Sequence, residues 1–413
     1  MMHAQIIQHI TQPFKNKAQS DSFLASFILV PANLTILDQD LRQLDQELAN
    51  YERAFLNPEI EQNLLSKNEL LASFAISKAE NSSLTLMEAQ QVYKLVLSQL
   101  ELNFIGDKLR AKKKLTYKDY EKLEFFNIAK TFRYVSSLEI KLEQLDEKFI
   151  LDLHARLTRG LDIFADYLSG FDVYKAGAWR DNDQIRVGGY QPALHEDVPS
   201  LVGQLLTWVK EGLEPSKMGV FHTALYAVHP FNNGNKRVCR ILEHLLWRLA
   251  GFNQQNLYSL SYYYHQQKDR YYKHLLNSLK KRHLNYFTNL TLEAGVLSIL
   301  GVLKTSIESL RSRAVKQGDL GEKEQQIIKW LVKRKELNFK SLTRKTRGKM
   351  ARQTLATYLK KLVEEGWLRK RSSGKNVFYS LDLDLREEGL YQQWLGLVLE
   401  KLSFVPDEYR LVV

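Results

Sequence analysis

The stretch HPFNNGNKRVCR, His229 to Arg240, decides how this chain is built, because it joins two apolar segments through a short polar loop. The segment before it, Met218 to Val228, is apolar on most faces. It predicts a central helix that ends before Pro230, since the residue before a proline disfavours helical conformation. The segment after it, Arg237 to Ala250, predicts a second buried helix closed by Gly251. The sequence therefore predicts polar side chains gathered between two buried helices.

The loop has the residue types of an anion site beside a base. Its second half begins a helix, where unpaired N–H groups and the helix dipole favour an anion. Gly234 allows close approach of the backbone, and Arg237 and Arg240, one turn apart, form a fork for phosphate oxygens. His229 is a candidate general base. Singly, such residues are more often helix caps or solvated charges, but together they indicate hydroxyl attack on a nucleoside triphosphate.

The rest of the chain is predicted to be mainly helical, because apolar residues recur three and four apart. The predicted helices cover 34–54, 87–104, 120–134, 146–158, 197–211, 268–280 and 286–312. One glycine-rich break, Ser169 to Pro192, separates them, and its stretch Gln184 to Val187 alternates polar and apolar residues. This break predicts a β-hairpin or an extended flap.

Positive charge is concentrated near the C-terminus. The net charge is +12, and residues 321–382 hold 17 Lys and Arg against 6 Asp and Glu. Such a basic segment indicates a polyanion partner, most often nucleic acid. Helices are predicted at 325–334, near Phe339 and at 351–366, followed by two strands around the turn Ser372 to Lys375. Three helices and a basic hairpin resemble a winged helix-turn-helix.

On this interpretation the winged helix meets duplex DNA with six side chains. Recognition-helix residues reach base edges or phosphates in a major groove, and wing residues contact the phosphate backbone. The alternative is a winged helix used for protein contact or dimerisation. The predicted DNA contacts are Arg352, Gln353, Thr354, Arg369, Arg371 and Lys375.

Composition places the chain among ordinary globular proteins, with 44% apolar and 26% charged residues in 413. Its single cysteine, Cys239, excludes an intrachain disulfide and a cysteine-rich zinc site. The first residues lack the apolar core of a signal peptide. The longest apolar run, Ala294 to Leu303, is far shorter than a membrane span. We therefore expect a cytoplasmic protein with no membrane partner.

The quoted loop resembles the signature of the Fic family, HxFx(D/E)(G/A)N(G/K)RxxR. MGVFHTALYAVHPF (218–231) resembles the helix that precedes the signature, and LSYYYHQQKDRYYKHL (260–275) resembles the helix downstream. GAWRDNDQIRVGG (177–189) resembles the flap that docks a target segment as an added strand. The resemblance covers about residues 34–300 and implies transfer of a phosphate-containing group, most often AMP from ATP, to a side-chain hydroxyl of a target protein.

The resemblance assigns a role to each residue of the loop. It makes His229 the base that takes the proton from the target hydroxyl, and Phe231 the apolar anchor of the loop. Gly234 and Asn235 match positions that hold phosphates through the backbone and the amide. Arg237 matches the arginine of the nucleotide phosphates, and Arg240 the one that orders the γ-phosphate.

Two positions of the loop leave the chemistry open. The acidic position that binds Mg²⁺ in the family is Asn233 here, and an amide oxygen adds no negative charge, so Mg²⁺ should bind weakly. Lys236 belongs to the Fic pattern but is common in the branch that contains the Doc toxin, which transfers a phosphoryl group. The phosphate-binding set is therefore Gly234, Asn235, Lys236, Arg237 and Arg240, with Asn233 as the doubtful metal ligand.

A second segment, AISKAENSSLTLMEA (75–89), resembles the family's inhibitory motif, (S/T)xxxE(G/N). Glu80 and Asn81 fit its end, whereas Ile76 stands where Ser or Thr is usual. A glutamate paired with Arg240 would occupy the place of the γ-phosphate. The resemblance thus implies autoinhibition by Glu80; the alternative is a surface glutamate near a helix start.

The resemblance also implies a docking role for the flap and a complete architecture. An edge strand accepts a target segment through backbone hydrogen bonds, and the candidates are Gln184, Ile185, Arg186, Val187 and Gly188. The fold class is mainly α: a Fic-type helical core with a β-hairpin flap, an N-terminal helical region and a C-terminal winged helix. The predicted domains are an N-terminal region with the inhibitory-type helix (1–110), a Fic core (111–295), a connecting helix and linker (296–320), a winged helix (321–383) and a C-terminal helical tail (384–413).

Three functions remain at this point. The first is a protein adenylyltransferase that moves AMP from its substrate ATP, with weakly bound Mg²⁺, to a Ser, Thr or Tyr hydroxyl of a target protein. The second is Doc-like phosphoryl transfer on the same scaffold. The third is a catalytically weak DNA-binding transcriptional regulator. A homodimer is a further expectation, because Fic-like cores often self-associate.

Overall fold

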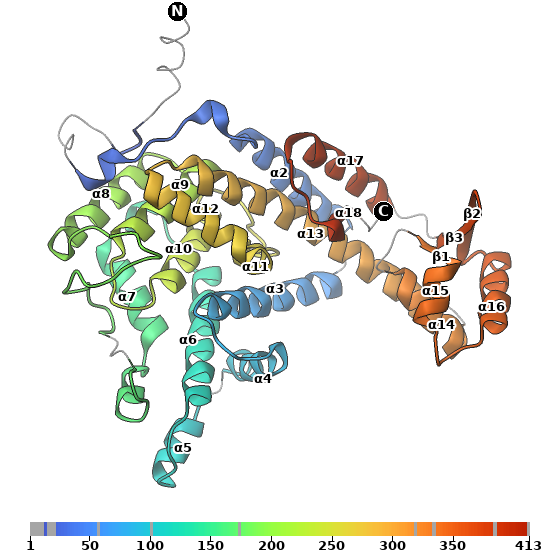
Figure 1. Cartoon of the computed structure of the whole chain (residues 1–413), viewed down its shortest axis with the longest axis horizontal. Coiled ribbons are helices and arrows are strands. Elements are labelled where there is room, and N and C mark those ends of the chain that lie inside the picture. Colours follow the sequence, from blue (N-terminus) through green and yellow to red (C-terminus); the bar gives the residue numbers. More distant parts are fainter. Residues whose placement is uncertain are drawn as a thin grey trace, which may run out of the picture. The chain divides into compact units, whose positions relative to one another are not determined.

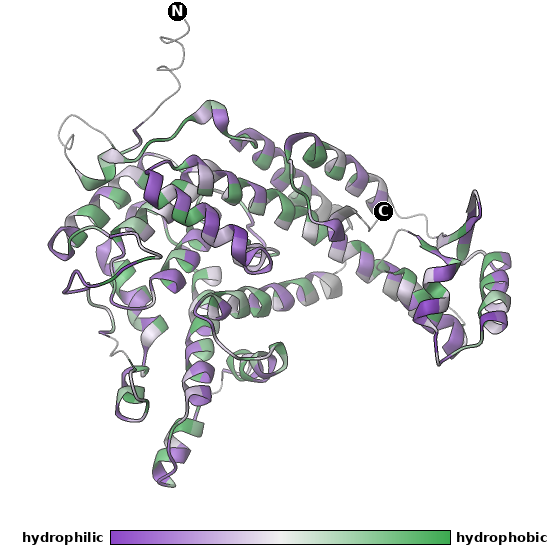
Figure 2. Ribbon diagram, viewed as in Figure 1, coloured by the Kyte–Doolittle hydropathy of each residue, from purple (hydrophilic) through white to green (hydrophobic). Residues whose placement is uncertain are grey.

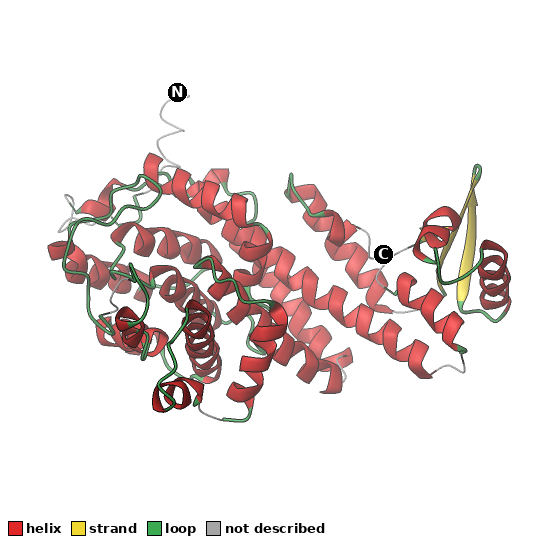
Figure 3. Ribbon diagram, turned by 60° about the horizontal axis from the view of Figure 1, so that its bottom comes forward, coloured by secondary structure: helices red, strands yellow, loops and turns green. Residues whose placement is uncertain are grey.

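The computed structural model describes residues 12–14, 22–55, 58–99, 102–171, 175–317, 320–332, 336–382 and 386–410. These residues are mainly helical, and their strands form one small sheet (Figure 3). The described part of the chain confirms the mainly α fold class. The first eleven residues, part of the flap segment (172–174) and part of the predicted linker (318–319) lie outside it.

The chain divides into two compact units, residues 1–46 with 65–298 and residues 47–64 with 299–413. Most of the predicted N-terminal region and core therefore belong to one unit. The predicted winged helix and C-terminal tail belong to the other.

The helices of the first unit, some of which continue into residues of the second, begin at positions that the sequence marks. Thr85 and Glu88 form a capping box at α4, and Thr116 and Asp119 form one at α6. The helices, drawn in Figure 1, are α2 (Asp38–Phe55), α3 (Pro58–Ala79), α4 (Leu86–Leu97), α5 (Phe104–Arg110), α6 (Tyr117–Ser137), α7 (Glu147–Thr158), α8 (Val198–Lys210), α9 (Pro215–Val228), α10 (Asn235–Leu249), α11 (Leu260–Gln266), α12 (Lys268–Lys281) and α13 (Asn285–Gln317).

The centre of the first unit is the pair α9 and α10, as the two apolar segments beside the loop predict. Nearly every residue of both helices is buried. Gly219 on α9 permits a close approach of helices, because a Cβ there would lie 2.7 Å from the Cα of Thr288 on α13. The two helices therefore fix the loop between them from both sides.

Helix α13 is long and apolar. Its stretch Asn285–Arg311 has 27 residues and could cross a membrane by length and composition. However, 78% of its apolar window is buried inside the protein, and a core helix has the same composition. The run Ala294 to Leu303, from which we expected no span, is thus part of a longer buried helix.

The second unit contains the winged helix. Its helices pack through leucines and isoleucines around a small apolar core, and helices of both units carry hydrophobic and hydrophilic stripes (Figure 2). The strand order is β1-β3-β2, all antiparallel. The elements are α14 (Glu322–Leu331), β1 (Leu337–Asn338), α15 (Phe339–Lys345), α16 (Arg352–Glu364), β2 (Leu368–Ser373), β3 (Asn376–Leu381), α17 (Arg386–Lys401) and α18 (Asp407–Arg410).

Three features differ from the expectations. The predicted hairpin of the flap is reduced to a single bridge between Val187 and Tyr190, whose backbone groups exchange hydrogen bonds of 3.0 and 2.8 Å. The predicted helix 87–104 ends at Leu97, and α5 follows as a separate helix. The inhibitory-type helix was expected in the N-terminal region without bounds, and the structure places it at α3, whose last residues begin the inhibitory-type motif.

Candidate active site

His229 occupies a special backbone position between α9 and the loop. Its φ of 53° lies in the left-handed region, and its N–H donates to the carbonyl of Leu225 at 2.9 Å, which closes the helix. This conformation turns the chain away from the helix axis directly at the candidate base. Burial, aided by the positive charge of Arg180, lowers the pKa of His229 to about 4. The imidazole is therefore neutral near pH 7 and can accept a proton.

Asn235 holds the loop in shape from the first turn of α10. Its side-chain amide donates to the carbonyl of Phe231 at 2.7 Å and accepts from the N–H of Phe231 at 2.9 Å. The ring of Phe231 is fully buried, as expected for an anchor. The structure thus gives the amide of Asn235, predicted to hold phosphate, a partner within the loop. Asn235 can therefore contribute to an anion site through its backbone N–H at the start of α10, and not through its side chain.

His154 on α7 supports the other side of the loop. Its Nδ1 accepts the N–H of Gly177 at 3.1 Å, so its Nε2 carries the proton and donates to the carbonyl of Asn233 at 3.1 Å. The imidazole stacks on Phe231 with ring centroids 3.9 Å apart. Burial lowers the pKa of His154 to about 4 and keeps it neutral. A Cβ at Gly234 would meet this ring at 3.4 Å, which helps explain the glycine.

Arg180 joins the flap to the end of α9. Its guanidinium, from a side chain only 3% exposed, donates to the carbonyls of His229 at 2.8 Å, Asn182 at 2.7 Å and Ala193. Its own N–H donates to the carbonyl of Pro230 at 2.8 Å. A cation here also interacts favourably with the C-terminal dipole of α9. One buried residue therefore fixes the flap, the base and the loop together.

A cavity of about 390 Å³ lies beside the loop. It brings together His229, Asn233, Gly234, Asn235 and Lys236 from the predicted site, and Arg186, Val187 and Gly188 from the predicted flap. Gln184 and Ile185 do not line it. The remaining lining residues are Glu80, Tyr226, Asn232, Tyr272, Leu275 and Leu276.

The two arginines that were predicted to bind phosphate are buried and do not line this cavity. Arg237 is 1% exposed and Arg240 is 2% exposed. The guanidinium of Arg240 donates to the carbonyl of Ala75 at 3.2 Å and lies 4.6 Å from the ring centre of Tyr271. Lys236 donates to the carbonyl of Ala79 at 3.2 Å. Cations of the loop thus bind main-chain carbonyls in the last turn of α3, where the helix dipole is negative.

Glu80 follows α3 directly, and its partners differ from the expected one. Its carboxylate lies 3.4 Å from Nζ of Lys236 and 3.8 Å from Nε of Arg237. No ion pair joins it to Arg240 among the described side chains, so the predicted Glu80–Arg240 pair is corrected to Glu80 with Lys236 and Arg237. Burial raises the pKa of Glu80, but these cations outweigh it and hold that pKa below its ordinary value.

A second carboxylate approaches a different nitrogen of Arg237. Glu124 on α6 lies 3.1 Å from Nη1 of Arg237 and accepts the hydroxyl of Tyr120 at 2.7 Å. Burial raises the pKa of Glu124 to about 7, although the charge of Arg237 opposes that rise. Two carboxylates, those of Glu80 and Glu124, therefore lie close to the buried guanidinium of Arg237.

The residues present do not fit a dedicated Mg²⁺ site. Asn233 would offer one neutral amide oxygen, and the nearest carboxylate on the cavity wall, Glu80, is paired with two cations. In the described part of the chain no three His, Cys, Asp or Glu side chains gather as metal ligands. Because Mg²⁺ prefers several carboxylate or phosphate oxygens, the protein itself would hold it weakly.

The flap residues beside the cavity keep an open backbone edge. The N–H of Gln184 donates to the side-chain oxygen of Asn182 at 3.1 Å and not to a strand. Within the described residues, no backbone hydrogen bond ties Ile185 or Arg186 to another segment. The carbonyl of Ile185 accepts the guanidinium of Arg186 at 2.9 Å. Strand addition here would therefore use the N–H groups of Ile185 and Arg186 and would displace that guanidinium from the carbonyl.

The predicted DNA contacts lie on the winged helix, but they are not equivalent. Arg352 and Gln353 are exposed at the start of α16, and Lys375 is exposed in the turn between β2 and β3. Thr354 is half-buried. Arg369 and Arg371 form ion pairs, the first with Asp382 and the second with Glu336.

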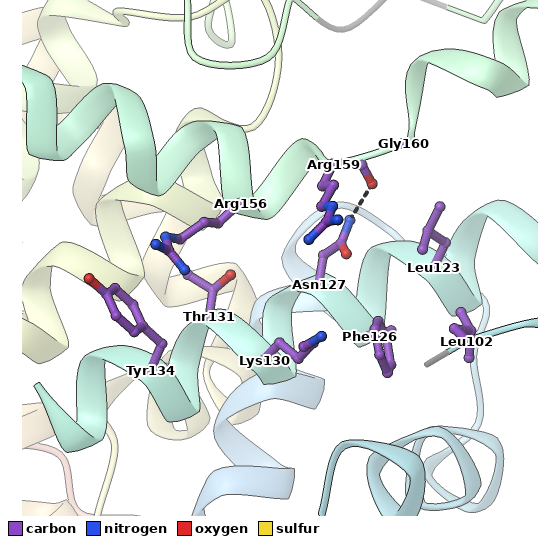
Figure 4. A pocket seen from close by; sticks show the side chains of 10 residues that line it. All are labelled: Leu102, Leu123, Phe126, Asn127, Lys130, Thr131, Tyr134, Arg156, Arg159 and Gly160. Carbon is purple, nitrogen blue, oxygen red and sulfur yellow. Dashed lines mark hydrogen bonds between the residues drawn. The ribbon is translucent and has the colours of Figure 1, made fainter. Parts of the chain in front are cut away.

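A second cavity of about 370 Å³ lies between α6 and the end of α7 (Figure 4). Its wall combines Phe126, Tyr134 and Arg156 with the amide of Asn127, which donates to the carbonyl of Arg159 at 2.8 Å. None of the predicted site residues lines it. The candidate active site is therefore the cavity at the loop.

Sequence reasoning missed His154, Arg180 and Glu124 as residues of this site, and it favoured a core position for Tyr272, which lines the cavity. Arg180 lies within the quoted flap segment, so its position there was a usable signal. Tyr272 lies in the downstream segment, and its hydroxyl donates to the carbonyl of Ala79 at 3.0 Å. His154 and Glu124 lie on helices that the sequence marks only by their apolar periodicity.

Comparisons with known families match two segments of the chain. Residues 144–247 match the model of the Fic/DOC family, and residues 320–402 match the model described as penicillinase repressor. The first segment contains the whole loop with His154 and Arg180. The second contains the winged helix and all of α17.

Curated relatives are similar over part of the chain. The "Protein adenylyltransferase Fic" of Drosophila persimilis is 27% identical over 134 residues, which is 31% of this chain and 24% of that protein. The "Protein adenylyltransferase fic-1" of Caenorhabditis briggsae is 29% identical over 108 residues, or 25% of this chain and 19% of the relative. The chain thus spans about a quarter of the Drosophila protein, whose length is mostly unmatched.

Solved structures are similar at low identity. A Fic family protein from Desulfovibrio desulfuricans G20 gives a TM-score of 0.48 at 18% identity and covers 86% of this chain and 99% of that one. Fic-1 from C. elegans (its residues 134–508) gives a TM-score of 0.48 at 17% identity over 64% of this chain and 72% of that one.

Proposed function

The chain carries a Fic/DOC family domain at residues 144–247, and from this premise we propose that it is a protein adenylyltransferase. Its substrates would be ATP and a target protein with a Ser, Thr or Tyr hydroxyl. The observation that carries the proposal is the shared cavity. Neutral His229, the start of α10 and the open flap edge all border the same 390 Å³ space.

The reaction follows from this arrangement. The target hydroxyl attacks the α-phosphorus of ATP, the bond from the α-phosphorus to the bridging oxygen breaks, and pyrophosphate leaves. His229 takes the hydroxyl proton on its neutral imidazole. The N–H groups at the start of α10, with Lys236, would stabilise negative charge on the phosphates. The flap would hold the target segment by backbone pairing at Ile185 and Arg186.

We propose that the end of α3 inhibits this reaction. ATP needs the cations that now bind Glu80 and the carbonyls of Ala75 and Ala79. A nucleotide with its phosphates at Arg237 and Arg240 would have to displace them. Autoinhibition would therefore act through the last turn of α3 together with the carboxylate of Glu80.

The test uses ATP labelled at the α- or the γ-phosphate, with the wild type, Glu80→Gly and His229→Ala, in Mg²⁺ and in Mn²⁺. Label on protein from the α-position alone, raised in Glu80→Gly and absent in His229→Ala, supports AMP transfer. Label from the γ-position supports the Doc-like phosphotransferase instead. Absence of both labels, restored by Asn233→Asp, would show that metal binding limits this site.

A second function is proposed for the other unit. The penicillinase-repressor match and the charge excess of residues 321–382 support DNA binding by the winged helix. One chain can carry both functions, since they reside in different units. A regulator with a weak catalytic site remains the alternative for the whole protein.

A further inference from the structure

Two groups of cations on the winged helix differ in their partners, and the exposed wing residues Lys370 and Lys375 belong to neither. In the first group the charge is already compensated by an acidic neighbour. Arg371 lies 2.6 Å from Glu336 and stacks on Phe378 at 4.9 Å, and Arg369 pairs with Asp382. Both wing arginines that we predicted to contact DNA belong to this group. A phosphate would have to compete with a carboxylate at each of them.

The second group is the turn cluster: Arg344, Lys345, Arg347 and Lys349. All four side chains are exposed. Within the described residues none of the four makes an ion pair or a side-chain hydrogen bond. They lie within six positions, at the end of α15 and in the turn that leads to α16. Their charges therefore gather on one small surface.

The local sequence leaves this charge uncompensated. Residues 337–363 contain eight Lys and Arg and no Asp or Glu. The nearest acidic residues in the sequence, Glu336 and Glu364, face Arg371 and Lys360. Positive charges that lie close together on a folded surface repel one another, and a bound polyanion reduces this repulsion.

The turn that carries the cluster is well defined. The hydroxyl of buried Thr346 donates to backbone carbonyls at 3.1 Å, and its own carbonyl accepts the N–H groups of Lys349 at 2.8 Å and Met350 at 3.0 Å. Gly348 supplies a φ of 79° within this turn. The cluster is thus presented on a fixed turn and not on a free tail.

The start of α16 lies at the end of the same turn. Ala351 is its N-cap and offers no side-chain acceptor, so the first N–H groups of this 13-residue helix remain open. Arg352 is exposed there, with its guanidinium 5.3 Å from the ring centre of Phe339. Turn cations and open N–H groups together match the way proteins grip DNA phosphates.

We propose that the turn cluster and the start of α16 form the surface that binds the phosphate backbone of duplex DNA. The paired arginines of the wing contribute less. This inference rests on the DNA-binding function proposed for the winged helix. It moves the interface from β2 toward the turn between α15 and α16.

The test measures binding of the full-length protein to a mixed-sequence duplex of about 30 base pairs by fluorescence anisotropy, from roughly 50 to 200 mM salt. The turn variant is Arg347→Gln/Lys349→Gln, and the comparison variant is Arg369→Gln/Arg371→Gln. Both remove two positive charges. Each lost phosphate contact lowers the slope of log K against log salt by about 0.9. We expect a loss of about 1.8 in the turn variant and less than half of that in the comparison variant.

The outcomes separate the inference from the function on which it rests. An equal loss in the two variants would show that only bulk charge matters, and a larger loss in the comparison variant would return the interface to the wing; either overturns the inference. A wild type without salt-dependent binding would overturn DNA binding itself, whereas AMP transfer would stand unaffected. Thermal unfolding of each variant checks folding, and the single reversal Arg347→Glu should reproduce the loss at an exposed site.

Discussion

His229 and His154 flank the loop, and burial keeps both imidazoles neutral. The reason is that a charged ring loses more hydration than a neutral one when it leaves water. A base with a pKa of about 4 is fully deprotonated at physiological pH, although its proton affinity is modest. The imidazole of His229 is therefore always free to accept a proton at physiological pH, but it is a weak base.

The pH profile of transfer tests this state of His229. In the Glu80→Gly variant we expect kcat/KM to stay level as the pH falls from 8 to about 5, and to fall only near pH 4, because His229 becomes protonated there. His229→Ala should lower kcat by a factor of about 10² to 10⁴. An acid limb near pH 6.5 that vanishes in His229→Ala would contradict the buried, neutral imidazole.

Glu124 holds a buried arginine, and its removal should make the protein depend on phosphate. In a Glu80→Gly background, Glu124→Gln leaves the charge of Arg237 without a carboxylate neighbour, which should destabilise the free protein by a few kcal/mol. The phosphates of ATP can then supply the missing negative charge. We expect ATP to raise the melting temperature more in Glu80→Gly/Glu124→Gln than in Glu80→Gly.

Glu121→Gln is the matched control for this prediction. Glu121 is equally buried on α6 but accepts hydrogen bonds from Ser83 and does not contact Arg237. It should lower stability without enlarging the ATP-dependent shift. The same shift in both double variants would rule out a role for Glu124 in holding Arg237.

The sequence could indicate the residues of the loop but not those that support it. His229, Gly234 and Lys236 share one short motif, so their proximity follows from the chain itself. His154 reaches the loop across 79 positions, and Arg180 bonds His229 across 49. Only packing of α7 against α10 and of the flap against the end of α9 brings such residues together, and no spacing rule reports that packing.

At the scale of elements, α3 is the helix whose contacts change the predicted mechanism of inhibition most. Its end contributes a carboxylate and two main-chain carbonyls to the cations of the loop. A side-chain substitution can remove the first but not the others. Inhibition should therefore be released in steps.

Glu80→Gly should raise transfer, and Glu80→Gly/Tyr272→Phe should raise it further. The second change removes the hydrogen bond from Tyr272 to the carbonyl of Ala79, which at about 1 kcal/mol corresponds to roughly a fivefold gain in the open state. The measurement is the rate of α-label incorporation at saturating ATP.

Tyr134→Phe serves as the control, because Tyr134 lies on α6 and borders the second cavity, not the cavity at the loop. It should add nothing to Glu80→Gly. Equal rates in Glu80→Gly and Glu80→Gly/Tyr272→Phe would show that the carboxylate alone holds the site closed.

The bounds of α3 could not be predicted from the sequence, for a physical reason. Its apolar residues do not follow a single stripe, so the helical period is weak. The flap also departed from its pattern: alternation of polar and apolar residues predicted paired strands, whereas the structure forms one bridge at Val187. In place of a second strand, Arg180 donates to the carbonyl of Asn182, and the N–H of Gln184 donates to the side chain of Asn182.

At the scale of the whole molecule, buried imidazoles should shape stability against acid. Burial lowers the pKa of His154 and His229 to about 4 and that of His244 to about 3, from an ordinary 6.5. Between these values the unfolded chain binds more protons, so stability falls as the pH drops below 6.5. Glu124, with its pKa raised to about 7, acts in the opposite sense and mainly between pH 4.5 and 7.

Unfolding by urea, followed by circular dichroism between pH 7 and 4, measures this loss. Three histidines oppose one glutamate, so we expect a net fall that is steepest below about pH 5. His244→Phe removes one of the groups at a distance from the loop and should flatten the fall. A stability that rises toward pH 4 would contradict the buried, neutral state of these rings.

Organisation at this scale was predictable in outline. The shift in charge near residue 321 marks the winged helix, and the apolar pair around the loop marks the centre of the first unit. The division of the remaining chain was not predictable, because residues 47–64 join the second unit although they precede the core in the sequence. Contacts between distant segments decide such membership, and composition does not record them.

The guanidinium of Arg180 has one further consequence, for how a target would be chosen. It bonds the carbonyl of the base and the backbone of the flap at once, so the two cannot shift relative to each other without breaking these contacts. A polypeptide laid along the flap would then meet His229 at a constant number of residues from its point of pairing. Target choice would then depend on the position of the hydroxyl residue along the bound segment. The identity of the surrounding side chains would matter little.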